Sequence, residues 1–336
     1  MFNGLNVVIK SIDDLSNGYV QREGYIFTAL THPGNVYDAI VIRQPIQADV
    51  ESPIYEKSSR SLEEHISLIN KYQLEKAVVI AESLDFIVKC PSLKYLHIIP
   101  ANVESEFDFS PLYAMPEIVM LTCRTCDVDN KRVYGQIDYK KVKGLIDVGV
   151  AGKGHIDYNK ISSLKSIDVT DIKAKNLYDV FCSKEMDTIR AICCGLKSLE
   201  GIEQSSNLTC LYLFNNRSLS DISSLKNVKS SLRALRIANC AKIQDFSVLG
   251  ELEKLEMLSI KGSNSLNDLK FLNRLKNLKT FVFDINIADG DLTPCLKLDY
   301  AACLKDRRHY NIKDKDLPKG NFSHGNEGIE AWRTLE

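Results

Sequence analysis

An L-x-x-L-x-L pattern of apolar residues recurs along the second half of the chain, and its copies begin 24, 23 and 23 residues apart. The four clearest copies begin at Leu208, Leu232, Leu255 and Leu278. Alternation places two side chains of each short strand on one face. A single unit cannot cover that face alone, so consecutive units must stack around a shared core. The pattern therefore predicts a repeat solenoid with a parallel sheet.

Weaker copies extend the array toward the N-terminus, so that about nine units run from residue 93 to about residue 300. One copy is degenerate and its register is ambiguous, and a partial unit precedes the array. The segment after each strand carries apolar residues three apart, which suits a 3₁₀ or loose helical turn on the outer side. The weaker units begin at Leu93, Ile118, Leu164 and Met186, the degenerate copy lies near Val142–Val148, and the partial unit begins at Leu74.

These residues resemble the leucine-rich-repeat family, and in particular its short class of roughly 22-residue units, found in internalins and in regulatory subunits of type 1 phosphatases. The resemblance covers about two thirds of the chain. It implies an α/β solenoid with a curved parallel sheet, a short 3₁₀ or helical outer side and a general role in binding. In this family the ninth residue of each unit points inward and hydrogen-bonds the backbone of the bend. That role falls here on Asn216, Asn286, Cys240, Cys194, Cys126 and Ser263.

The two ends depart from the repeat. Residues 1–73 predict a small N-terminal α/β cap, in which Ser61 and Glu64 form a capping-box pattern. A helix with an apolar face of Leu62, Ile66, Ile69 and Tyr72 is expected to follow. The repeats are assigned to residues 74–300. Residues 301–336 predict a C-terminal cap and a polar, irregular tail that contains the single tryptophan, Trp332.

Composition narrows the function class. The 43 basic and 44 acidic residues give a net charge of -1, which favours neither nucleic acid nor an anionic membrane as a partner. No stretch approaches the roughly 18 apolar residues of a membrane-spanning helix, and the N-terminus lacks signal-peptide features. We therefore expect a cytoplasmic protein whose ten cysteines are free thiols.

No motif predicts catalysis, a cofactor or a metal site. Cys123 and Cys126 form a C-x-x-C, but no second pair exists, and both residues occupy inward positions of a repeat. The glycines of residues 149–154 only faintly resemble a phosphate loop and are read as a connection between repeats, while the six histidines form no paired motif.

The third, fifth, seventh and eighth positions of each unit are expected to project from the concave face of the sheet. Tyr212 and Phe214 are the leading candidates, because a solvent-facing aromatic has no core role and aromatic and arginine side chains dominate binding hot spots. Arg190 and Arg236 should flank them as cationic edges, and Thr125 should also project. The predicted contact residues are Tyr95, His97, Arg124, Asp168, Arg190, Tyr212, Phe214, Arg236, Lys261 and Asp284.

The sequence thus predicts a non-catalytic scaffold that binds another protein of unknown identity, in one version an immunity or inhibitor protein. Self-association through Phe214 stays open. One alternative is an enzyme whose active site lies in the N-terminal region, near His32, Asp38 or His65, with repeats that select the substrate. Another is a surface-exposed adhesion protein similar to internalins.

Overall fold

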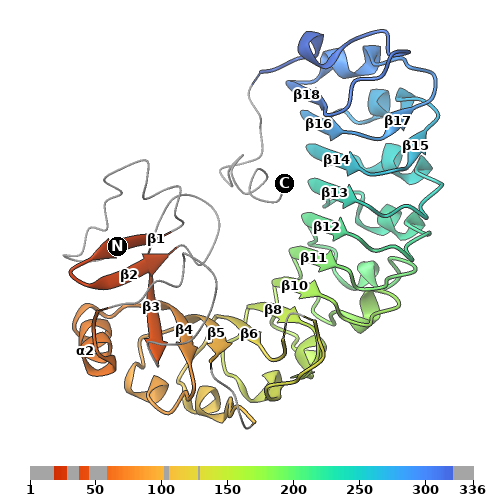
Figure 1. The fold of residues 1–336 in the computed structure, drawn as a ribbon. Helices are drawn as coiled ribbons and strands as arrows, with labels where there is room; N and C mark the ends of the chain where they lie inside the picture. The colour runs from red at the N-terminus through yellow and green to blue at the C-terminus, as the bar shows by residue number, and fades with distance from the viewer. Residues whose placement is uncertain (1–18, 29–37, 45–58, 102–105, 128, 321–336) are drawn as a thin grey trace. The chain divides into compact units, whose positions relative to one another are not determined.

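The structure is a computed structural model, and it describes residues 19–28, 38–44, 59–101, 106–127 and 129–320 (Figure 1). The chain forms two compact units, and the boundary between them falls between Tyr158 and Asn159. Trp332 of the predicted tail and His32 of the alternative N-terminal active site lie outside the described residues.

The first unit begins with an antiparallel arrangement that becomes parallel. Strands β1 and β2 pair antiparallel, β2 pairs antiparallel with β3, and β3 then pairs parallel with β4. Strands β4, β5, β6 and β8 continue in parallel, while β7 and β9 form a separate small pair. The strands are β1 (Tyr19–Arg22), β2 (Tyr25–Thr28), β3 (Ala39–Gln44), β4 (Lys76–Ala81), β5 (Tyr95–Pro100), β6 (Met120–Arg124), β7 (Ile137–Asp138), β8 (Asp147–Ala151) and β9 (His155–Ile156).

Helix α2 (Leu62–Tyr72) begins where the capping-box pattern predicted. The Ser61 hydroxyl accepts the Glu64 N–H at 3.2 Å, and the Glu64 carboxylate accepts the Ser61 N–H at 2.7 Å. The fully buried side chains of the helix are His65 and Ile69. The predicted helix is therefore confirmed, although a histidine that the apolar pattern passed over lies at the centre of its buried side. Short 3₁₀ turns follow the strands of this unit at Ile87–Lys89, Ser110–Ala114 and Tyr139–Lys141, and a further turn spans Tyr158–Lys160.

The second unit consists of parallel strands that alternate with 3₁₀ turns, as the repeat predicts. Residues paired along the sheet are 22, 22, 24, 23 and 23 positions apart from Asp168 to Val282. The strands are β10 (Ser166–Thr170), β11 (Thr188–Ile192), β12 (Cys210–Phe214), β13 (Ala234–Ala238), β14 (Met257–Lys261), β16 (Thr280–Phe283) and β18 (Tyr300–Cys303), with a small pair formed by β15 (Ser265–Leu266) and β17 (Asn286–Ile287). The 3₁₀ turns are Leu177–Asp179, Ile202–Gln204, Ser223–Val228, Ser247–Glu251, Lys270–Arg274, Thr293–Lys297 and Asp314–Asp316.

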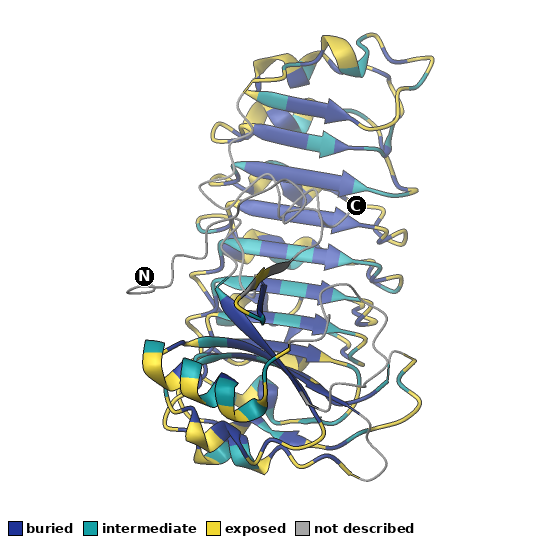
Figure 2. Cartoon of the chain, turned by 60° about the vertical axis from the view of Figure 1, so that its left-hand side comes forward, coloured by how far each residue is buried: buried dark blue, intermediate teal, exposed yellow. Residues whose placement is uncertain are grey.

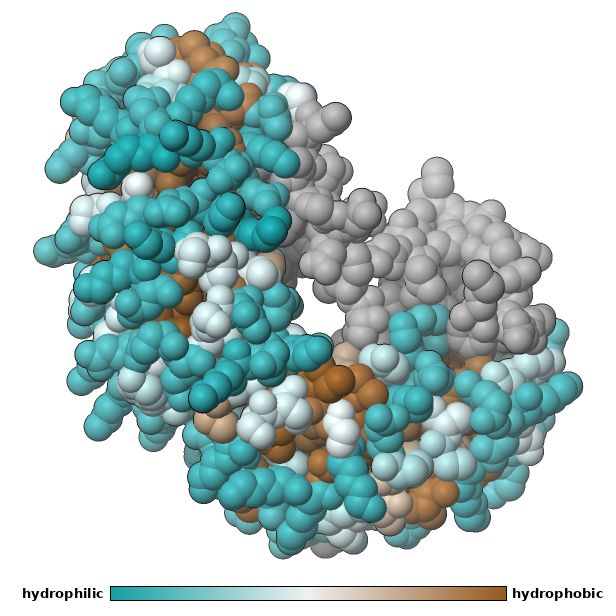
Figure 3. Space-filling view, turned by 180° about the vertical axis from the view of Figure 1, so that it is seen from behind, coloured by the Kyte–Doolittle hydropathy of each residue, from teal (hydrophilic) through white to brown (hydrophobic). Residues whose placement is uncertain are grey.

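The core of the second unit lies along two inward rows of the sheet, and their members are almost fully buried (Figure 2). Stacking gives each side chain a neighbour from the unit on either side, so that each buried aliphatic group contributes roughly 1.5–3 kcal/mol. Figure 3 shows that the surface of this unit seen from behind is largely hydrophilic. The first row is Ile167, Ile189, Leu211, Leu235, Leu258 and Phe281, and the second is Val169, Ala191, Leu213, Ile237, Ile260 and Phe283.

The chain leaves each of the strands β10 to β14 through a left-handed residue. Asp171, Cys193, Asn215 and Asn239 have φ between 52° and 55°, and Gly262 takes the same place at 126°. The N–H of Asn215 donates to the carbonyl of Ala238 in the next unit at 2.9 Å, and its counterparts in the units around it pair in the same way. The bend therefore continues the ladder of backbone hydrogen bonds by one residue.

The residue after the left-handed position points inward, as predicted for Asn216, Cys194 and Cys240. The Asn216 amide donates to the carbonyls of Ala191 at 2.8 Å and Phe214 at 3.1 Å, and its oxygen accepts the Cys194 N–H at 3.0 Å. These contacts satisfy backbone groups that the bend would otherwise bury without partners.

Two ninth-position predictions are wrong. Ser263 is exposed, because the bend after β14 is one residue longer and Asn264 takes the inward place, donating to the carbonyl of Ile243 at 2.8 Å. Asn286 is only partly buried and bonds the hydroxyl of Ser265. In that unit the Tyr310 hydroxyl reaches in from the C-terminal cap and donates to the carbonyl of Ile285 at 3.1 Å.

The structure also shows the register of the degenerate copy and the structure at the predicted C-terminal boundary of the repeats. Strand β8 places Val148 and Val150 inward, which fixes the register that the sequence left ambiguous. Residue 300, where the repeats were predicted to end, is the start of a further parallel strand, β18, and the described residues after it form turns that include the 3₁₀ turn Asp314–Asp316. Gly152 and Gly154 lie in the turn after β8, as expected for a connection between repeats, whereas Gly149 lies within the strand.

Candidate functional site

The predicted contact residues of the second unit, apart from Asp284, lie in two neighbouring outward rows of the sheet. Tyr212 pairs with Arg190 on one side and Arg236 on the other, and the row runs on to Val282. The prediction that Tyr212, Arg236 and Val282 share one face is therefore confirmed. The second row, two residues further along each strand, contains Phe214 and Lys261.

Charged and aromatic groups contact each other across these rows. Arg190 Nη1 lies 3.4 Å from Asp168 Oδ2, and the guanidinium of Arg236 lies 4.8 Å from the centre of the Phe214 ring. Burial raises the pKa of the Asp168 carboxyl, and the positive charge of Arg190 opposes that rise. Tyr212 stands in the row between the two arginines.

Exposure differs among these side chains. Asp168, Arg190, Tyr212 and Phe214 are partly exposed. Arg236 is only 3% exposed, so the expectation of an exposed cationic edge is wrong at this position. Part of the physical reason is that its guanidinium packs against the Phe214 ring instead of extending into solvent. The surface offered by these strands is thus an aromatic pair with one accessible ion pair.

The remaining predicted residues of the second unit lie near the ends of its strands. Lys261 is the last residue of β14 and is partly exposed. Asp284 directly follows β16, and its Oδ1 accepts the N–H of Gly262 at 2.6 Å. Asp284 therefore holds the bend after β14 as well as presenting a negative charge.

Tyr95, His97 and Arg124 belong to the first unit. The ammonium of Lys76 lies 5.6 Å from the centre of the Tyr95 ring. Burial, with a smaller contribution from the nearby charge of Arg124, lowers the pKa of His97 to about 4. Arg124 is exposed. His97 is therefore neutral at physiological pH and half-buried, rather than a charged surface group.

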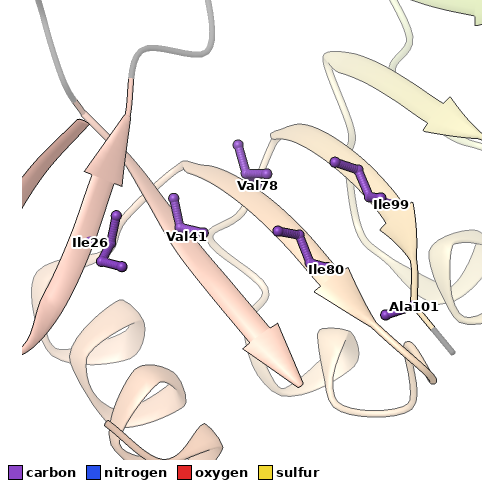
Figure 4. Close-up of a cluster of buried hydrophobic side chains, with 6 residues drawn as sticks. All are labelled: Ile26, Val41, Val78, Ile80, Ile99 and Ala101. Atoms are coloured by element: carbon purple, nitrogen blue, oxygen red, sulfur yellow. The ribbon is translucent and has the colours of Figure 1, made fainter. Parts of the chain in front are cut away.

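The same outward face of the first unit is apolar at strands β2 to β5 (Figure 4). Ile26, Val41 and Val78 are paired in one row, and each is at most 4% exposed. Both faces of this part of the sheet are therefore buried. The remaining members of the cluster are Ile80, Ile99 and Ala101.

The N-terminal region was the alternative location for an active site. Lys76 Nζ lies 2.6 Å from Asp38 Oδ2, so this carboxylate is held in an ion pair. His65 is fully buried against the edge of the Tyr25 ring, and burial lowers its pKa. Across the described ranges, no group of three or more histidine, cysteine or acidic side chains is arranged to hold a metal ion.

A buried polar chain in the first unit was missed by sequence reasoning. The Tyr139 hydroxyl lies 2.9 Å from His155 Nδ1, and His155 Nε2 lies 2.8 Å from the Thr125 hydroxyl, which donates to the carbonyl of Lys153. Thr125 is fully buried, so its predicted outward orientation is wrong. Burial lowers the pKa of His155 to about 4, although a hydrogen bond to Ala151 opposes this. These hydrogen bonds connect the loops beside β8 to one another.

Most of the cysteines are buried residues of the core. All ten are free thiols, and Cys123 and Cys126 are 1% and 5% exposed on inward positions, as predicted. Burial raises the pKa of Cys90, Cys194 and Cys240 to about 11. Thiols that are buried and protonated act as small apolar groups of the core.

Comparison with known proteins supports the architecture. No protein-family model matches the sequence, and no curated protein matches it. Among solved structures, an internalin from Listeria monocytogenes is similar over 70% of this chain and 69% of that chain, with a TM-score of 0.50 and 19% sequence identity. The described residues contain no helix with the length and hydropathy needed to cross a membrane. The repeated strand and 3₁₀ turn, the inward leucine rows and this similarity together show that the fold is an α/β leucine-rich-repeat solenoid.

Proposed function

We propose that the chain is a non-catalytic scaffold that binds another protein on the outward face of strands β10 to β13. The observation that carries the proposal is the partly exposed aromatic pair Tyr212 and Phe214, beside the ion pair of Arg190 and Asp168. These side chains point away from the leucine core, so packing in that core does not explain them. Aromatic and arginine side chains on a rigid, preformed surface are typical of binding hot spots.

The finer parts of the proposal rest on the repeat itself. The spacing of 22 to 24 residues between paired positions favours the short, internalin-like class of repeats. We extend the proposal to a cytoplasmic location, as expected from the sequence. We also extend it to an immunity or inhibitor role, because a preformed face can cover a partner without changing shape. An adhesion role would use the same face with a different partner.

The test is a co-purification with three versions of the full chain as bait: the unchanged chain, the double variant Tyr212→Ala and Phe214→Ala, and the control Tyr178→Ala. Tyr178 is a 52% exposed aromatic on a 3₁₀ turn, so its truncation removes a comparable ring elsewhere. A partner on the proposed face is retained by the unchanged chain and the control, and is lost by the double variant.

The recovered partner is then titrated against the purified baits. We expect the double variant to bind at least about thirtyfold more weakly, which corresponds to roughly 2 kcal/mol. Equal recovery by all three baits would place the interface elsewhere, and failure of every bait to recover a protein would count against a scaffold function.

A further inference from the structure

The loops that follow the strands of the second unit enclose a groove of about 640 Å³. These loops lie beyond the arrowheads in Figure 2, where the buried strands give way to exposed residues. Asp284 is the one predicted contact residue among those that line it. The lining residues are Arg217, Asn239, Ala241, Lys242, Gly262, Ser263, Asp284, Lys305 and Arg307.

The groove has a strong excess of positive charge. Four cationic side chains line it, Arg217, Lys242, Lys305 and Arg307, against the single carboxylate of Asp284. That carboxylate already accepts the N–H of Gly262 at 2.6 Å. Throughout the described part of the chain, no carboxylate lies within ion-pair distance of any of the four cations.

Cations elsewhere in the same unit do find partners. Arg233 Nη1 lies 2.7 Å from Glu256 Oε1, and Lys229 Nζ lies 3.4 Å from Glu253 Oε1. Both pairs join residues that precede the strands, at the ends opposite to the groove. Like charges collected without counter-ions raise the local potential and attract an anionic ligand.

Arg307 is held in place for such a ligand. Its Nη2 donates to the carbonyl of Asp284 at 3.3 Å, and Lys313 Nζ donates to the carbonyl of Arg307 at 2.6 Å. Its Nε is buried without an acceptor among the described residues. A guanidinium fixed by its own backbone contacts loses little freedom when an anion binds.

We propose that this groove binds an acidic, extended peptide segment of a protein partner. The loops that supply its cations follow β12, β13 and β18, and the four strand steps from β12 to β18 span roughly 19 Å at the usual strand spacing. A single phosphate cannot reach both ends of such a site. An extended peptide presents side chains on one side every ~7 Å, so that several carboxylates meet separate cations.

Single-stranded nucleic acid would offer similar charge spacing, but the groove does not suit its bases. Grooves that bind single strands combine cations with aromatic side chains on which the bases stack. The residues that line this groove include no aromatic side chain. The identity of the ligand as part of a protein rests on the function proposed above.

The experiment measures binding of a fluorescein-labelled peptide of alternating glutamate and serine to the full chain. The groove variant is Lys242→Glu with Lys305→Glu, and the control is Lys254→Glu with Lys276→Glu. All four lysines are exposed, and both variants change the net charge equally. We expect the control to bind like the unchanged chain and the groove variant to lose at least about tenfold in affinity. Equal melting temperatures of the two variants show that both fold.

Three outcomes would overturn the proposal. The first is equal affinity of all three proteins for the peptide. The second is tighter groove-dependent binding of a thymidine oligonucleotide of the same length. The third is complete displacement of the peptide by inorganic phosphate at an ionic strength where sodium chloride has no effect, which indicates a site for one ion.

The outcome is separable from that of the proposed function. Peptide binding that the groove variant loses, together with failure to recover any protein partner, supports the groove and contradicts the scaffold. A partner lost by the Tyr212 and Phe214 variant, with no peptide binding to any protein, supports the scaffold and contradicts the groove.

Discussion

His155 lies in the middle of a hydrogen-bond chain that links Tyr139 to Thr125. Thr125 donates its hydroxyl proton to the carbonyl of Lys153, so its oxygen accepts a proton from His155 Nε2. In the neutral ring, His155 Nδ1 accepts from the Tyr139 hydroxyl at 2.9 Å. Burial lowers the pKa of His155 to about 4, so the imidazole is neutral at pH 7.

The hydrogen-bond chain through His155 predicts that the protein loses stability in acid. The pKa of His155 is about 4 in the folded chain and near 6.5 when unfolded, so the unfolded state binds more protons between these values. The stabilisation is complete above pH 6.5 and is lost as the pH falls to 4, by roughly 2–3 kcal/mol. Denaturant unfolding at pH 7 and pH 4 should show a smaller loss for His155→Gln. Because His97 has the same sign, some loss remains in that variant, but an unchanged loss would contradict the role of His155.

Adjacent residues on β12 test the orientation of the candidate site. Leu213 is fully buried, and Leu213→Ala should cost about 2–5 kcal/mol because it opens a cavity in the stacked core. Phe214→Ala should cost only about 1 kcal/mol, mainly through loss of the contact with Arg236. Melting curves of the two variants check this. If both melt equally early, Phe214 is a core residue and the assignment of the outward face is wrong.

At the scale of the repeat element, the left-handed bend explains why asparagine, aspartate and glycine recur after the strands. A β-branched residue is strongly disfavoured at positive φ, whereas glycine is not. Asn215 has φ of 52°, so Asn215→Val should destabilise the chain by about 1–2 kcal/mol, while Asn215→Gly should stay within about 0.5 kcal/mol. Urea unfolding of both variants measures the difference, and similar losses for valine and glycine would argue against a left-handed bend.

The C-terminal cap completes the last bend with a side chain from outside the repeat. The Tyr310 hydroxyl donates to the carbonyl of Ile285 at 3.1 Å and accepts the N–H of Ile287 at 3.0 Å. Tyr310→Phe keeps the ring but leaves two buried backbone groups without partners, and it should cost about 1–3 kcal/mol. Tyr300→Phe, at a partly exposed tyrosine of β18, is the control. Thermal unfolding that ranks Tyr300→Phe as the more damaging change would contradict this cap.

Sequence periodicity was sufficient for the strands and the core, because each inward leucine row repeats at a fixed spacing. It failed where one residue shifts the bend, as at Gly262, and where a distant residue completes it, as Tyr310 does. For the candidate site, the sequence predicted which side chains point outward from the sheet, but not how exposed they are. Whether Arg236 extends into solvent depends on its packing against Phe214, and the groove cations converge from loops that are distant in sequence.

For the whole molecule, the burial of the cysteines shows how completely the repeats bury their inward positions. Seven of the ten are buried, and only Cys182 and Cys193 are exposed. Cys193 occupies the left-handed bend position and Cys194 the inward position after it, so adjacent thiols have opposite environments. Reactivity requires the thiolate, and burial raises the pKa of the inward thiols, to about 12 for Cys295.

A thiol-reactive chromophore should therefore distinguish these classes in the native chain. We expect fast reaction at Cys182 and Cys193, slower reaction at the partly exposed Cys210, and reaction of the rest only after unfolding, with a final total of ten thiols. The double variant Cys182→Ser and Cys193→Ser should lose the fast phase and keep its melting temperature, since neither side chain is in the core. Reductant should leave that melting temperature unchanged. A total below ten in the denatured chain would reveal a disulfide, and fast native reaction at Cys194 or Cys240 would show that the inward rows open to solvent.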